Sequence, residues 1–149
     1  MMGGHLPILE VMLPLAAAPL CALVRRPLLA WGIAVAATLF ALAGSLVLLI
    51  QVWSGGVVSY HIGGWAPPWG IEFRLDAANS FVLVIVALIG ALCAIYGRES
   101  VAREVATQDQ PLFYTMLLLC FAGMLGVGSS GDAFNLFVFL EICSLSSYV

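Results

Sequence analysis

Charged residues are scarce in this chain, and lysine is missing altogether. Only 9% of its 149 residues are charged, whereas 63% are hydrophobic. A soluble domain carries about 25% charged residues, so this chain has too few polar side chains to cover its own surface in water. The sequence therefore indicates an integral membrane protein surrounded by the lipid bilayer, and we expect it in the plasma membrane. With a net charge of -3 and dispersed arginines, it offers no basic surface for nucleic acid.

Clustered metal ligands are also missing. The sequence has no CxxC pair, and only two histidines accompany its four cysteines. Each cysteine stands alone in an apolar run, which is typical of small buried hydrophobic residues rather than of a metal site or a disulfide framework. We therefore expect neither a metal nor a cofactor. The cysteines are Cys21, Cys93, Cys120 and Cys143.

Five apolar stretches dominate what is present, and the first four reach or approach the roughly 20 residues that a membrane-spanning helix needs. The fifth has no charged or aromatic anchor after it, so we expect it to be a cut helix and the chain to be the N-terminal part of a larger subunit. The prediction is a single all-α membrane domain over residues 1–149. Its helices are expected at about residues 6–24, 28–52, 77–96, 112–128 and 133–149.

The arginines set the expected topology. Four of the five lie between the first and second stretches or between the third and fourth. Because short cytoplasmic loops are enriched in Lys and Arg, both of these loops are expected inside and the N-terminus outside. The same rule places residues 53–76 and the 129–132 turn outside. The acids next to Arg98 and Arg103 are interpreted as part of a solvated cytoplasmic loop without a function.

The outer loop contains two strand-like runs, residues 57–62 and 70–75, separated by glycine, proline and tryptophan. This pattern predicts a small β-hairpin on the membrane surface, with an irregular aromatic loop as the alternative. Trp53, Trp65 and Trp69 suit the headgroup level. Farther on, residues 126–131 match G-x-G-x-x-G but lack the βαβ context of a dinucleotide site, so the glycines are expected to end the fourth helix and form a tight turn.

Glu141 is the most informative residue, because it lies inside the last apolar stretch. With a rise of about 1.5 Å per residue, it sits about 13 Å below the start of that helix, near the middle of a hydrocarbon core about 30 Å thick. Ionisable residues at such depth usually face a protein interior or a wet cavity and mark ion or proton paths. A proton-relay carboxyl is therefore predicted; a polar contact that joins two helices is the alternative.

Other polar residues accompany Glu141 on the fifth helix. At 100° per residue, Ser144 and Tyr148 share its stripe, whereas Asn135 lies on a flank. Asp132 precedes the helix directly and is predicted to cap it, with a role at a proton or cation entrance as the alternative. Glu10, about one turn into the first helix, is expected near the outer interface within reach of water.

Two segments resemble the antiporter-like family of membrane subunits. Gly131–Glu141, which reads GDAFNLFVFLE and continues to Ser147-Tyr148, is similar to the family's fifth-helix signature, and Gly64–Glu72, followed by Leu75-Asp76, is similar to its outer loop. The family holds the D subunits of Mrp-type cation/proton antiporters and the proton-pumping membrane subunits of respiratory complex I and membrane-bound hydrogenases. The pairing of these two segments favours the Mrp-type branch.

The resemblance implies a function that the residues alone leave open. It implies a proton-translocating subunit of a multisubunit Na⁺/H⁺ antiporter, not itself an enzyme, with other subunits as partners and H⁺ and Na⁺ as ions. In the family, the glutamate that matches Glu141 pairs with a lysine on the seventh helix, beyond this sequence. The alternatives are a proton-pumping subunit of a complex I-type oxidoreductase or hydrogenase, with the redox chemistry in partners, and an inactive structural fragment.

Overall fold

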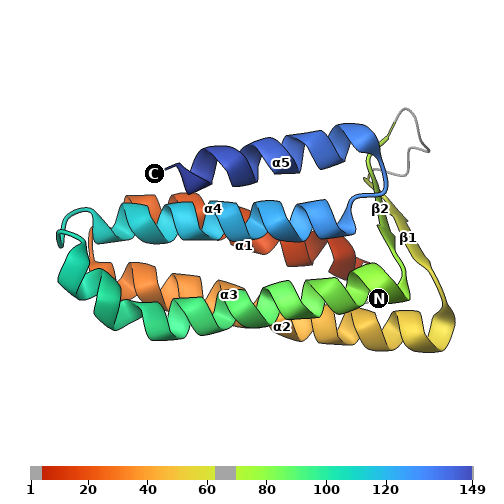
Figure 1. Ribbon diagram of the computed structural model, residues 1–149, viewed down its shortest axis with the longest axis horizontal. Helices are drawn as coiled ribbons and strands as arrows, with labels where there is room; N and C mark the ends of the chain where they lie inside the picture. The colour runs from red at the N-terminus through yellow and green to blue at the C-terminus, as the bar shows by residue number, and fades with distance from the viewer. Residues whose placement is uncertain (1–4, 63–69, 149) are drawn as a thin grey trace.

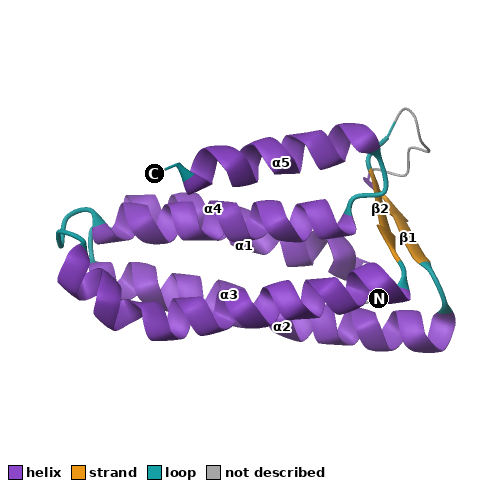
Figure 2. Ribbon diagram, viewed as in Figure 1, coloured by secondary structure: helices purple, strands orange, loops and turns teal. Residues whose placement is uncertain are grey.

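The computed structural model describes residues 5–62 and 70–148, which form five helices and one hairpin (Figures 1 and 2). Three helices are longer than 18 residues, and a fourth has 18, so four are long and apolar enough to cross a membrane. The fifth helix is also apolar but has 15 residues. The predicted helical membrane bundle is confirmed. The helices are α1 (Leu6–Leu23), α2 (Pro27–Gly55), α3 (Ala77–Glu104), α4 (Gln110–Ser129) and α5 (Ala133–Ser147).

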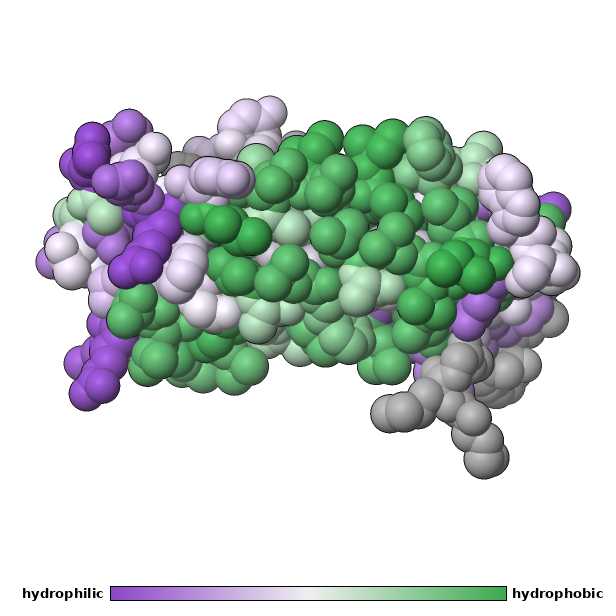
Figure 3. All heavy atoms as spheres, turned by 90° about the horizontal axis from the view of Figure 1, so that it is seen from below, coloured by the Kyte–Doolittle hydropathy of each residue, from purple (hydrophilic) through white to green (hydrophobic). Residues whose placement is uncertain are grey.

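The helices run side by side with alternating direction, and α5 packs principally on α4 (Figure 1). One face of the molecule shows a broad apolar band with polar residues gathered at both ends (Figure 3). Large apolar side chains remain exposed on the bundle, among them Phe81, Ile89 and Leu92. In lipid such exposure carries no hydrophobic cost, so the surface fits a bilayer rather than water.

Small residues bring α1 and α2 together. Ala30, Ala34, Ala37 and Ala41 follow one another at helical spacing in α2, and all four are buried. Small side chains allow helix backbones to approach closely, and close packing is what drives helix association in a bilayer. Ala30, Ala34 and Ala37 share a core cluster with α1 residues and with residues of α3 and α4, so this face of α2 turns toward the interior of the bundle.

The predicted hairpin is present as β1 (Val58–His61) and β2 (Glu72–Leu75), which pair antiparallel. Phe73 and Leu75 point inward and are buried, and the Phe73 ring lies 6.3 Å from that of Phe139 in α5. The hairpin therefore closes one end of the bundle and contacts α5 there (Figure 2). Trp65 and Trp69, expected at the headgroup level, lie outside the described residues.

Helix α3 is longer than expected and continues to Glu104, so Arg98 and Arg103 lie on a helix rather than in a loop. Arg98 stacks over the Trp31 ring at 4.6 Å from its centroid, and the Trp31 indole N–H donates to the Ala94 carbonyl at 2.9 Å. Arg103 pairs with Glu99 at 3.0 Å. These contacts make a helical extension beyond the apolar span favourable, although hydropathy alone ends the span at Tyr96.

Helix α4 ends at Ser129, close to the expected residue 128, and the glycines near this end serve the helix as well as the turn. Gly126 and Gly128 lie within α4, and only Gly131 lies in the turn. A Cβ at Gly126 would overlap the Phe139 ring, and one at Gly128 would lie 2.8 Å from Leu83. These two glycines therefore allow α5 and α3 to approach α4 closely.

Candidate functional site

Glu141 lies in the middle of α5, eight positions after Ala133 and about 12 Å along the helix axis. Its side chain is exposed, because the face of α5 that packs on α4 carries Asn135, Phe139 and Ser146 instead. Glu141 is two residues beyond Phe139, which puts it about 200° around the helix. No cation pairs with it among the described residues. The carboxyl thus faces away from the helix that supports it.

The residues predicted to accompany Glu141 are only partly brought together. Ser144 and Tyr148 share its exposed side, with Tyr148, just past the end of α5, 84% exposed. Asn135 turns the other way, is 5% exposed, and its Nδ2 has no acceptor among the described residues. The site that the geometry supports is therefore the outward face of α5, with Asn135 belonging to the α4–α5 contact.

Asp132 occupies the N-cap position of α5 and also contacts the hairpin. One carboxylate oxygen accepts the Asn135 backbone N–H at 2.7 Å, and the other accepts the Glu72 N–H at 3.1 Å. The Gly131 N–H donates to the Glu72 carbonyl at 2.7 Å. A single side chain thus satisfies a free donor of α5 and one of β2, which fixes where the helix that carries Glu141 begins.

Replacing Asp132 by alanine is expected to destabilise the protein by about 1–2 kcal/mol, because a helix cap and a strand contact are lost together. The measurement is the thermal unfolding midpoint in lipid nanodiscs. Asp109→Ala is the matched control, because Asp109 also precedes a helix but makes no capping hydrogen bond with its side chain. Equal midpoints for the two variants would contradict the role assigned to Asp132.

Glu10 departs from expectation, since it is not interfacial. It is 1% exposed, and its carboxyl is hydrogen-bonded to the Ser45 hydroxyl of α2. The sequence does hold a signal for this contact, namely Gly44-Ser45 in the middle of an otherwise apolar stretch. Such a small polar pair in a membrane helix indicates a contact with another helix.

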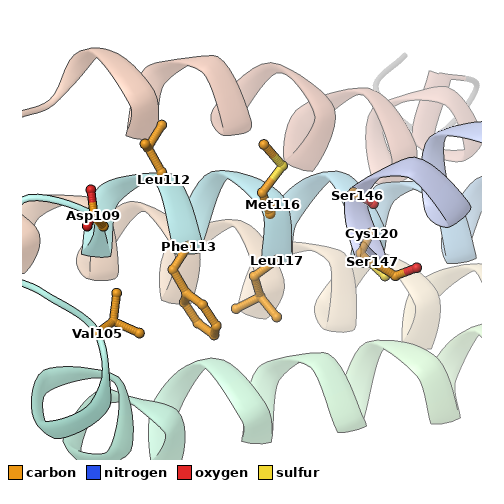
Figure 4. A pocket seen from close by; sticks show the side chains of 9 residues that line it. All are labelled: Val105, Asp109, Leu112, Phe113, Met116, Leu117, Cys120, Ser146 and Ser147. Carbon is orange, nitrogen blue, oxygen red and sulfur yellow. The ribbon is translucent and has the colours of Figure 1, made fainter. Parts of the chain in front are cut away.

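An open groove of about 500 Å³ runs along α4 beside the end of α5 (Figure 4). Leu112 and Met116 lie on one side of α4, and Phe113 and Leu117 lie on the other. Glu141 does not line it, so the groove is not the site of the mid-membrane carboxyl. The remaining lining residues are Val105, Asp109, Cys120, Ser146 and Ser147.

The fold and the site together define a multi-pass helical membrane protein with a carboxyl in the middle of an apolar helix. Comparison with known proteins gives the family. The chain is 39% identical over 150 residues to the N subunit of NADH-quinone oxidoreductase from Desulforudis audaxviator, covering 99% of this chain and 30% of that protein. It is 29% identical to the D subunit of the Na⁺/H⁺ antiporter from Bacillus subtilis, covering 95% and 28%. No protein-family model matches the chain.

Solved structures of membrane complexes are similar to this chain as well. The Mrp complex from Dietzia sp. matches with a TM-score of 0.81 and 28% identity, covering 99% of this chain and 27% of the matched one. The membrane-bound sulfane sulfur reductase, an archaeal respiratory membrane complex, matches with a TM-score of 0.80 and 27% identity, covering 97% and 29%. The chain belongs to the antiporter-like family of membrane subunits. It spans less than a third of the length of these relatives.

Proposed function

We propose that this chain forms the proton-translocating part of a subunit of a multisubunit monovalent cation/proton antiporter, with Na⁺ as the expected cation. The observation that carries the proposal is Glu141, a carboxyl in the middle of the apolar helix α5 and directed away from α4. Ionisable residues inside membrane helices typically mark ion or proton paths. Relatives named as D subunits of Na⁺/H⁺ and K⁺/H⁺ antiporters support this assignment.

In this proposal Glu141 binds a proton from one side of the membrane and releases it to the other. The proton affinity of a carboxyl changes when a nearby cation approaches or withdraws. The described residues supply no such cation near Glu141, so the segment or subunit that covers the outward face of α5 provides it. Ser144 and Tyr148, on the same side, can hold the hydrogen-bonded water that a proton needs.

A second candidate function is a proton-pumping membrane subunit of a respiratory complex. The 39% identity to an NADH-quinone oxidoreductase subunit and the likeness to a sulfane sulfur reductase complex favour it. In either assembly this chain performs no redox step itself, and the oxidation and reduction of a respiratory complex take place in partner subunits. Both candidates use Glu141 as the proton-binding carboxyl. They differ in the process to which proton movement is coupled, which is cation exchange in the first and electron transfer in the second.

Everted membrane vesicles that contain the complete assembly separate the two functions. A pH-sensitive dye reports the internal pH after respiration has acidified the vesicles. Proton release on addition of Na⁺ or K⁺, present with the chain and lost when its gene is deleted, supports the antiporter. Proton uptake that depends on an electron donor and on the chain, without a response to added cation, supports the respiratory subunit. If deletion changes neither signal, both functions are wrong.

A further inference from the structure

Glu10 is a second carboxyl inside the membrane, and the proposed relay does not use it. It lies one turn into α1, is 1% exposed, and its neighbour Val11 belongs to the apolar core. Glu141 stands on α5, which is not among the principal contacts of α1. The two carboxyls therefore occupy different environments, one enclosed by helices and one on an outward face.

The hydrogen bonds around Glu10 can accommodate a proton on its carboxyl. The Ser45 hydroxyl oxygen lies within hydrogen-bond distance of the Glu10 carboxyl and 2.9 Å from the Ala41 carbonyl oxygen. A serine hydroxyl has one hydrogen and can donate only once. If Ser45 donates to Ala41, the remaining contact is satisfied only when the Glu10 carboxyl carries a hydrogen and donates it to the Ser45 oxygen.

The charges around Glu10 favour the same assignment. The helix α1 packs on α2 and α4, and neither of these carries an acid, a histidine, an arginine or a lysine. The other titratable side chains of the three helices are two cysteines and a tyrosine. Cys21 and Tyr114 belong to the core cluster that contains Ala30, and Cys120 lies beside Cys143. The nearby His5 is exposed and bonded to Tyr60. A carboxylate enclosed without a cation is costly, whereas a neutral acid with a satisfied donor is not.

We propose that Glu10 is a proton-binding site distinct from Glu141, holding its proton as a neutral carboxylic acid that donates to Ser45 and joins α1 to α2. This proton has a structural role. Because it makes the side chain neutral, a carboxyl can occupy a tight helix contact in place of an apolar side chain. Glu10 also packs beside Gly44, where an added Cβ would lie at ordinary van der Waals distance, 3.8 Å, from Glu10 Cγ.

Infrared difference spectroscopy of the complete assembly in lipid tests this proposal at neutral pH. Subtracting the Glu10→Gln spectrum from that of the unchanged protein is expected to leave the C=O stretching band of a protonated carboxylic acid. The carboxylate stretching pair in its place would overturn the proposal. Ser45→Ala gives an independent readout: removal of the acceptor is expected to shift the same C=O band, and an unshifted carbonyl region would contradict the Glu10–Ser45 donor assignment.

Discussion

Replacing Glu141 by glutamine is expected to reduce proton-coupled exchange to the background of vesicles that lack the complex. Glutamine keeps the size and hydrogen-bonding capacity of the side chain but cannot take up or release a proton at neutral pH. Because Glu141 faces away from α4, the substitution leaves the α4–α5 contact intact, and the complex should still assemble. The measurements are the dye response in everted vesicles and co-purification of the partner subunits.

Three further variants test whether the loss is specific to the carboxyl of Glu141. Glu104→Gln removes a carboxyl from the exposed end of α3 and should leave exchange unchanged. Glu141→Asp keeps a carboxyl on a shorter side chain and should retain part of the rate. If Glu141→Leu exchanges protons normally, Glu141 is not the relay carboxyl, and a structural role of this chain is favoured.

Replacing Gly126 by valine is expected to detach α5 from its place on α4. A Cβ there would overlap Phe139 Cγ. This is the ring atom bonded to Cβ, so it cannot rotate away as the end of a flexible side chain would. Overpacking a tight contact costs about 1–3 kcal/mol, and more where the backbone must move. Because α5 packs principally on α4, with the hairpin contacting mainly its first turns, the middle of the helix moves when this contact opens, and Glu141 moves with it.

The thiols of Cys120 and Cys143 report this displacement directly. Their sulfurs lie 3.7 Å apart across the α4–α5 contact, close enough for copper phenanthroline to oxidise them to a disulfide after a small movement. The unchanged protein should lose two hydrogens by mass spectrometry on oxidation, and Gly126→Val should lose them far more slowly. Gly32→Ala is the control, since a Cβ there meets nothing within 4 Å. Equal rates for all three proteins would show that α5 tolerates a side chain at Gly126.

Much of the architecture could be predicted from local sequence features. The five apolar stretches correspond to five helices, and the two strand-like runs pair as β1 and β2. Runs of apolar residues and turn signals act over a few neighbouring positions, so they can be read without the fold. The α1–α2 connection, which carries Arg25 and Arg26, and the C-terminal end of α3, which carries Arg98 and Arg103, lie at the same end of the bundle (Figure 1), as the topology prediction requires. Which side of the membrane this end faces stays a prediction.

The surroundings of two residues depend on helix length and packing, and one of them, Glu10, corrects an expectation. The place of Glu10, one turn from the start of α1, predicts an interfacial side chain, but α2 continues ten residues beyond Ser45 and encloses it. The glycine pattern predicts that α4 ends at about residue 128, and the helix does end at Ser129, but the pattern does not show that Gly126 lies against Phe139. In both cases the neighbour that decides the role is distant in sequence, namely Ser45 for Glu10 and Phe139 for Gly126.

The sequence by itself determined that this is a membrane bundle, that a hairpin covers one end, and that a carboxyl stands in the middle of α5. Only the tertiary structure decided which way that carboxyl faces. One side of α5 packs against the glycines of α4, and Glu141 lies on the opposite side. It also decided that Glu10 is enclosed rather than wet, since burial is set by the neighbouring helices and not by position along the chain.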